Sequence, residues 1–117
     1  MILGTDGLLD NLIESQILSA AQNYLRRVKA SIMKGVYSKD EVQHLQMFAN
    51  RLAQTALKNS MDNEAETPFA AELSKLAGKR YRGGKPDDIT VVVAVVFSEE
   101  ALQFRDDAEY HTSYLTP

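Results

Sequence analysis

The stretch Leu3-Gly4-Thr5-Asp6-Gly7-Leu8-Leu9-Asp10 places a carboxylate where a short hydrophobic run stops and a helical pattern is about to begin. A second stretch, Gly83-Gly84-Lys85-Pro86-Asp87-Asp88-Ile89-Thr90, places an acidic pair just before the most strand-like run. If the two strands lie antiparallel and side by side, both acids reach the same edge of one sheet. Clustered carboxylates repel one another unless a cation lies among them, so the two stretches predict a shared metal site.

The residues around these acids predict two strands. Met1 to Thr5 is interpreted as the end of a buried strand, and Asp6-Gly7 as the turn that ends it, since glycine supplies backbone freedom. Ile89 to Phe97 is β-branched and almost wholly apolar, which is typical of a strand covered on both faces. Four apolar residues should pack the first loop down and so fix Asp6: Leu8, Leu9, Leu12 and Ile13.

The chain offers few residues to cover the strand at Ile89 to Phe97. Each large apolar side chain left exposed there forfeits roughly 1.5 to 3 kcal/mol, a sizeable part of the usual net stability of about 5 to 15 kcal/mol. We therefore expect the isolated chain to self-associate through this strand or to be partly molten.

Two long amphipathic helices are predicted between the acid stretches. The first runs from about Ser15 to Met33 and ends at Gly35, with an inward stripe of Ile17, Leu18, Ala21, Leu25, Val28 and Ile32. The second follows a capping box at residues 38–41 and runs to about Asn59, with an inward stripe of Val42, Leu45, Ala49, Leu52, Ala53 and Ala56. A short loop joins them, which suggests an antiparallel pair on one face of a sheet.

A third, shorter helix is expected after Thr67, its N-cap, with Pro68 at the first helical position and Gly78 at its end. The basic, glycine-rich segment that follows contains Lys85 and is read as a flexible turn more readily than as a phosphate site. The basic cluster in the first helix and His44 in the second are read as surface features, and Met47 and Phe48 as packing residues.

Composition limits the kinds of partner and metal ligand that this chain can have. The 117 residues fit one domain or part of a larger one, and the net charge of -3 argues against a broad nucleic-acid surface. With no cysteine and two histidines, any metal would be held by oxygens, which points to Mg²⁺ or Mn²⁺. No apolar run is long enough for a membrane span, and no targeting sequence is evident, so a soluble protein is expected.

Three motifs, in this order, resemble the C-terminal part of the protein phosphatase 2C family, the metal-dependent serine/threonine phosphatases. They are Thr5 to Asn11, Thr67 to Ala70 and Gly83 to Val93. They are most similar to the branch of the mitochondrial phosphatases and their plant relatives. The resemblance implies an α+β fold, here a partial α/β/β/α sandwich with antiparallel sheet and a helix pair on one face. It covers residues 1–97, and residues 98–117 are expected to form a polar tail.

The resemblance also implies a binuclear Mn²⁺ or Mg²⁺ centre in the full-length family. Carried over, Asp6 and Asp87 would be metal ligands, Asp10 would help to hold a weaker third metal, and Gly7 and Asp88 would support the ligands without binding. A water that bridges the two metals would attack the phosphorus of a phosphoserine or phosphothreonine in a substrate protein. The sequence does not determine the cellular compartment, and the family resemblance suggests a mitochondrion or another organelle.

The family's N-terminal half, with its phosphate-binding arginine, acidic pair and Asp-Gly motif, has no counterpart here, and the chain is expected to begin in mid-domain. We therefore predict a fragment that lacks phosphatase activity alone, because two carboxylates hold a metal weakly. The alternative is a non-catalytic helical interaction module derived from a phosphatase. A haloacid-dehalogenase-like enzyme is disfavoured, since Gly4 stands where its nucleophilic acid would be.

Overall fold

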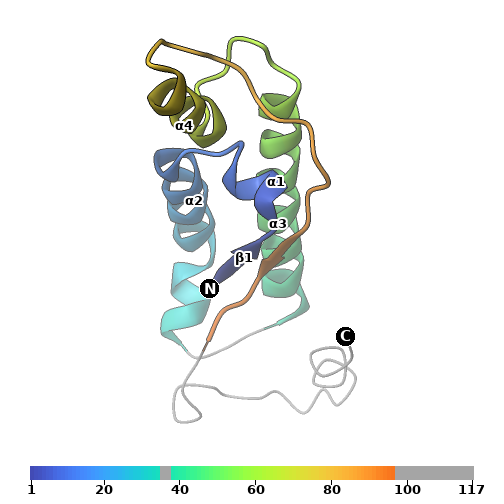
Figure 1. Cartoon of the computed structure of the whole chain (residues 1–117). Coiled ribbons are helices and arrows are strands. Elements are labelled where there is room, and N and C mark those ends of the chain that lie inside the picture. The colour runs from blue at the N-terminus through green and yellow to red at the C-terminus, as the bar shows by residue number, and fades with distance from the viewer. Residues whose placement is uncertain (35–37, 97–117) are drawn as a thin grey trace.

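The computed structural model describes residues 1–34 and 38–96. Two long helices stand side by side, and the two strands cross them on one side (Figure 1). Four predicted features lie outside the described part: the helix end at Gly35, the side chain of Ile32, Phe97 and the tail at 98–117. In chain order the elements are β1 (Ile2–Gly4), α1 (Asp6–Leu9), α2 (Glu14–Met33), α3 (Lys39–Ser60), α4 (Pro68–Ala77) and β2 (Val91–Val93).

The two strands join the beginning and the end of the described chain. β1 and β2 pair antiparallel, with Ile2 opposite Val93 and Gly4 opposite Val91. Backbone hydrogen bonds continue the pairing at both ends, because Thr5 donates to the Thr90 carbonyl at 3.1 Å and Ala94 to the Met1 carbonyl at 2.9 Å. The regular part of β2 is shorter than the predicted strand, since β1 offers it only a short partner.

Helices α2 and α3 form the predicted pair and pack against each other, and α3 lies against β2. The capping box that begins α3 is confirmed: the Glu41 carboxylate accepts hydrogen bonds from the backbone N–H of Ser38, at 2.9 Å, and from its hydroxyl. Burial of Glu41 opposes its ionisation, but hydrogen bonds from Ser31 and Ser38 outweigh it, and the pKa of Glu41 falls to about 2. Ser31 lies on α2, so this carboxylate links the two helices.

The core lies between the helix pair, α1 and the inner face of the sheet. It includes a stacked aromatic pair, Tyr24 and Phe48, whose ring centroids are 5.1 Å apart. The inward stripe predicted for α2 is partly wrong, because Leu18 and Leu25 are 56% and 51% exposed. The other buried apolar residues of this cluster are Leu8, Leu12, Val28, Leu52 and Ala56.

The segment after β1 is a helix and not the predicted turn. Thr5 precedes α1, and its carbonyl accepts hydrogen bonds from Leu8 and Leu9 at 3.0 and 3.3 Å. Leu8 is fully buried, whereas Leu9 and Ile13 are 53% and 36% exposed, so only one side of this segment packs down as predicted. Met47 was predicted to pack and is also exposed, in contrast to Phe48.

Helix α4 begins and ends as its sequence predicts. The Thr67 hydroxyl accepts a hydrogen bond from the Ala70 N–H at 3.1 Å, Pro68 opens the helix, and Gly78 ends it in the left-handed region at φ 69°. Figure 1 shows the chain returning from α4 along α3 to β2, so the second acid stretch passes beside α1.

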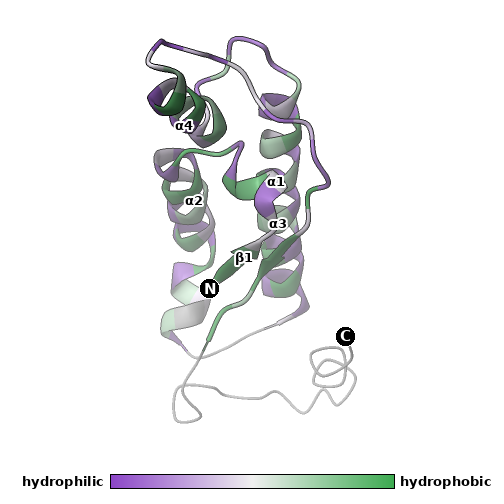
Figure 2. Ribbon diagram, in the orientation of Figure 1, coloured by the Kyte–Doolittle hydropathy of each residue, from purple (hydrophilic) through white to green (hydrophobic). Residues whose placement is uncertain are grey.

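These elements confirm the predicted fold class, a mixed α and β structure with an antiparallel sheet and a helix pair on one face. Figure 2 shows apolar residues along β2 and on parts of both long helices. Leu3 and Val92, directly paired between the strands, remain 54% and 52% exposed. Within residues 1–34 and 38–96, no helix combines the length and apolar character that crossing a bilayer requires.

Candidate metal centre

The two acid stretches meet where α1 packs against the chain before β2. A Cβ atom on Gly7 would collide with the carbonyl oxygen of Asp88 and would lie 3.0 Å from both the Asp88 carbonyl carbon and Ile89 Cγ1. Only glycine permits this approach. The residue after Asp6 and the residue after Asp87 therefore touch, although 81 positions separate them in sequence (88 minus 7).

Thr5 joins the same two segments from the other side of Asp6. Its hydroxyl donates to the carbonyl oxygen of Asp88 at 3.2 Å and accepts from the backbone N–H of Thr90 at 3.0 Å. Asp6 thus lies between two residues that both contact Asp88. The sheet pairing continues directly into the acid stretches, which is the arrangement that antiparallel strands predict.

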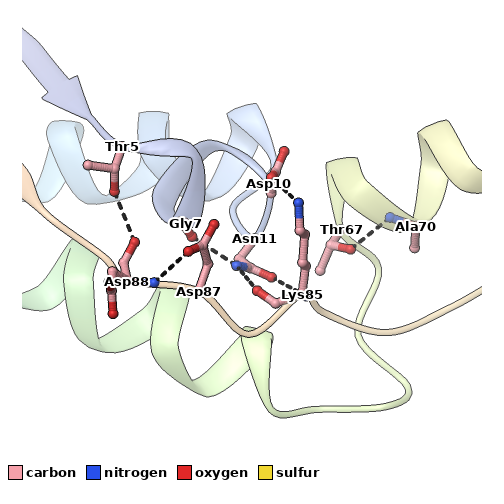
Figure 3. Close-up of polar contacts among 9 residues, drawn as sticks. All are labelled: Thr5, Gly7, Asp10, Asn11, Thr67, Ala70, Lys85, Asp87 and Asp88. Atoms are coloured by element: carbon pink, nitrogen blue, oxygen red, sulfur yellow. Dashed lines mark hydrogen bonds and ion pairs between the residues drawn. The ribbon is translucent and has the colours of Figure 1, made fainter.

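Asn11 holds the second stretch at Lys85, before the acidic pair. Its side-chain oxygen accepts from the Lys85 N–H at 2.8 Å, and its side-chain nitrogen donates to the carbonyls of Lys85, at 2.9 Å, and Gly7, at 2.8 Å. Asn11 is fully buried. Figure 3 shows its amide between α1 and the Lys85 backbone.

The acidic side chains themselves face solvent. Asp6, Asp87 and Asp88 are exposed, and the backbone N–H of Asp88 donates to Asp87 Oδ1 at 2.8 Å, which orients that carboxylate (Figure 3). A carboxylate that accepts one hydrogen bond keeps lone pairs for a cation. Exposed carboxylate oxygens without nitrogen or sulfur ligands suit a hard divalent ion such as Mg²⁺ or Mn²⁺.

The number of acids limits what this site can hold. In the part of the chain that the structure describes, no group of three or more His, Cys, Asp or Glu residues is placed to bind a metal ion. Asp6 and Asp87 can offer two carboxylates from adjoining segments, and a small divalent ion held by so few protein oxygens keeps most of its water.

Asp10 has a different neighbour. Its Oδ2 lies 3.8 Å from Lys85 Nζ, and the same ammonium group lies 5.6 Å from the ring centroid of Phe69 on α4. The Asp10 backbone carbonyl accepts from the Phe69 N–H at 3.0 Å. The structure therefore connects Asp10 to Lys85 and α4.

Two residues that hold this region were not singled out as site residues by the sequence. Asn11 stands between Asp10 and Leu12, and nothing beyond its place in the first motif marks it. Thr67 was predicted as a helix cap, but its hydroxyl also donates to the Gly83 carbonyl at 2.6 Å and so fixes the base of the second stretch. The only sequence signal for either role was its position within a motif.

Several known proteins are similar to this chain. It is 34% identical over 97 residues to "Protein phosphatase PTC7 homolog fig" of Drosophila grimshawi and 36% identical over 96 residues to "Protein phosphatase 2C homolog 7, mitochondrial" of Saccharomyces cerevisiae. It is 38% identical over 96 residues to "Probable protein phosphatase 2C 55" of Arabidopsis thaliana. Each match covers 82% of this chain and 27%, 24% and 17% of the respective relative.

A solved structure shares the fold. The X-ray structure of the photosystem II phosphatase PBCP matches with a TM-score of 0.52 and 26% identity, over 77% of this chain and 32% of that chain. No protein-family model matches. The chain thus spans well under a third of the length of the three sequence relatives.

Proposed function

Because the chain belongs to the protein phosphatase 2C family, we propose that its two acid stretches form part of the divalent-metal site of a protein serine/threonine phosphatase. The observation that carries this proposal is the contact between Gly7 and Asp88, which brings together the two segments that carry Asp6 and the Asp87-Asp88 pair. The substrate would be a phosphoserine or phosphothreonine ester in a protein.

The bound ion, Mn²⁺ or Mg²⁺, would acidify a water molecule and stabilise charge on the phosphoryl oxygens. The chain's own residues have simpler tasks. Asp6 and Asp87 offer carboxylate oxygens, the Asp88 N–H orients Asp87, and Gly7 lets the two segments approach. We propose Asp10 only as an outer contributor, since Lys85 Nζ lies 3.8 Å from its carboxylate.

We further propose that this polypeptide has no phosphatase activity by itself. Two carboxylates hold Mg²⁺ or Mn²⁺ weakly, and hydrolysis of a phosphate ester needs a firmly positioned ion. An assay with a phosphothreonine peptide and micromolar Mn²⁺ should show no turnover above the metal blank. Turnover comparable to that of a full-length protein phosphatase 2C would contradict this part of the proposal.

Calorimetric titration with Mn²⁺ tests the metal site directly. We expect weak binding by the wild-type chain that is lost in Asp6→Ala and in Asp87→Ala. Glu72→Ala is a matched control, because Glu72 is an exposed acid on α4, away from both stretches. Equal binding by all four proteins would show that the titration reports surface carboxylates in general.

A second function is favoured by a different observation. Leu3 and Val92 pair on a sheet face that is about half exposed, at 54% and 52%, which suits an interaction surface. We propose, as the alternative, a non-catalytic interaction module derived from a phosphatase. Absence of Mn²⁺ binding in the calorimetric titration would favour this module.

The compartment is also a proposal. The yeast relative is named as mitochondrial, and we propose that this protein acts in a mitochondrion or a comparable organelle. Imaging of the full gene product with a fluorescent tag, alongside a mitochondrial dye, tests the assignment. Diffuse fluorescence outside organelles would contradict it.

A further inference from the structure

The Asn11 side chain joins the two acid stretches, because it bonds both the N–H and the carbonyl of Lys85 as well as the carbonyl of Gly7. We propose that Asn11 is a positioning residue: its buried amide fixes the spacing between Asp6 and Asp87 and thereby sets the affinity of the metal site. This inference rests on the proposed function for its metal, and on the contacts of Asn11 for the spacing.

The hydrogen bonds use every polar group of the Asn11 side chain. Both hydrogens of the amide nitrogen have acceptors, the carbonyls of Gly7 at 2.8 Å and Lys85 at 2.9 Å, and the amide oxygen accepts from the Lys85 N–H at 2.8 Å. One acceptor follows Asp6 directly, and the Lys85 groups lie two positions before Asp87. A single rigid amide therefore links the two segments that carry the acids.

Asn11 is itself held by a hydrogen bond from α3. The Asn59 side-chain nitrogen donates to the Asn11 carbonyl at 2.9 Å and lies 3.3 Å from Gln16 Oε1. A Cβ atom on Gly84 would collide with the Asn59 carbonyl, so the second stretch also rests directly on this end of α3. Asn11 is thus held by α3 through Asn59, and it in turn holds the backbone of Lys85.

Solvent exposure of the acids makes this positioning necessary. Asp6 and Asp87 are exposed, and among the described residues the only hydrogen bond to the Asp87 side chain comes from its own neighbour, Asp88. Packing therefore does not hold these carboxylates in place, and their separation depends on the backbone that carries them. Partners that orient metal ligands from outside typically change affinity 10- to 100-fold when removed.

The first test measures Mn²⁺ affinity by EPR titration of the whole chain. Asn11→Leu keeps a similar volume and removes all three hydrogen bonds, and Asn11→Ser is a milder variant in case the first does not fold. We expect the dissociation constant to rise about tenfold or more. Val28→Ala is the control for lost stability, since Val28 is a buried core residue on α2 and belongs to neither stretch. At an equal fall in Tm it should change the dissociation constant less than about twofold.

The second test needs no metal. The chain has no cysteine, so a double variant carrying Asp6→Cys and Asp87→Cys can be cross-linked selectively with a short bismaleimide. The yield of intramolecular cross-link, measured by mass spectrometry, reports how often the two positions face each other. We expect a several-fold lower yield when Asn11→Leu or Asn11→Ser is added, and an unchanged yield when Val28→Ala is added.

The two readouts separate this inference from the proposed function. If the cross-link yield falls in the Asn11 variants but the wild-type chain binds no Mn²⁺, positioning by Asn11 is supported and the proposed metal site is rejected. Binding of Mn²⁺ that needs Asp6 and Asp87, with affinity and yield unchanged in both Asn11 variants, overturns positioning and leaves the metal site. Equal losses in Val28→Ala and the Asn11 variants would also overturn it, because general destabilisation would then explain the result.

Discussion

Gly7 and Asp88 lie in direct backbone contact, with no room for a Cβ atom on Gly7 against the Asp88 carbonyl. This contact joins α1 to the chain that enters β2, and it determines how closely the two acids approach. The metal site that we propose depends on this contact.

Gly7→Ala should therefore destabilise the chain out of proportion to one added methyl group. The methyl would force Asp88 and Ile89 away from α1, and overpacking of this kind lowers the free energy of unfolding by about 1 to 3 kcal/mol. Urea titration measures the loss. Ser19→Ala, at an exposed position of α2, should change the value by less than about 0.5 kcal/mol. A loss in Gly7→Ala no larger than in Ser19→Ala would mean that the contact can relax.

Thr67→Ala should lower the free energy of unfolding by about 1 to 2 kcal/mol. The substitution removes the cap of α4 and the hydrogen bond of 2.6 Å to the Gly83 carbonyl, and Thr67 is buried. Thr67→Ser retains the hydroxyl and should recover most of the loss. Thermal unfolding of the two variants checks this, and an equal loss in both would assign the effect to the methyl group instead.

Lys85→Met should change the free energy of unfolding by less than about 1 kcal/mol. The ion pair with Asp10 spans 3.8 Å between side chains that are 47% and 34% exposed, and such pairs contribute little. The hydrogen bonds from Asn11 are made to the Lys85 backbone and survive the substitution. Urea titration at low and moderate salt checks both points; a large, salt-sensitive loss would show that the ammonium group matters.

Glu41 should make the stability of the helix pair depend on pH. Its pKa is lowered from 4.5 to about 2 in the folded chain, so the ionised form stabilises the fold fully above pH 4.5. This contribution is lost as the pH falls from 4.5 toward 2. Glu41→Gln should be less stable than wild type at pH 7, and the difference in free energy of unfolding should shrink across this window. A constant difference would mean that the carboxylate charge is not responsible.

Val92→Glu should reduce self-association of the chain. We propose that association occurs through β2, the strand observed within the predicted segment 89–97, because Leu3 and Val92 present a paired apolar surface. Sedimentation equilibrium should show oligomers of the wild-type chain and mainly monomers of the variant. Leu76→Glu is the control: Leu76 is 79% exposed on α4 and its substitution should leave the oligomers intact. A monomeric wild-type chain with a sharp thermal transition would contradict the proposal.

The sequence predicted the helices well because their ends carry local chemical signals. Ser38 and Glu41 cap α3, and Thr67, Pro68 and Gly78 delimit α4, through contacts within a few residues. The apolar stripe of α2 was less well predicted. Tyr24 faces Phe48 in the core while Leu25 is exposed, and only packing against α3 decides which of these neighbouring apolar residues is buried.

The sequence by itself determined the long helices, the two strand segments, the fold class and the family. Only the tertiary structure decided that Asp6 begins a short helix, that Gly7 touches Asp88, and that Asn11 holds the Lys85 peptide. Helix caps and apolar periodicity act between neighbours in the chain, so a sequence displays them. The contacts of the candidate metal centre join positions more than 70 residues apart, as the 74-residue separation of Asn11 and Lys85 shows, and they exist only once β1 and β2 have paired.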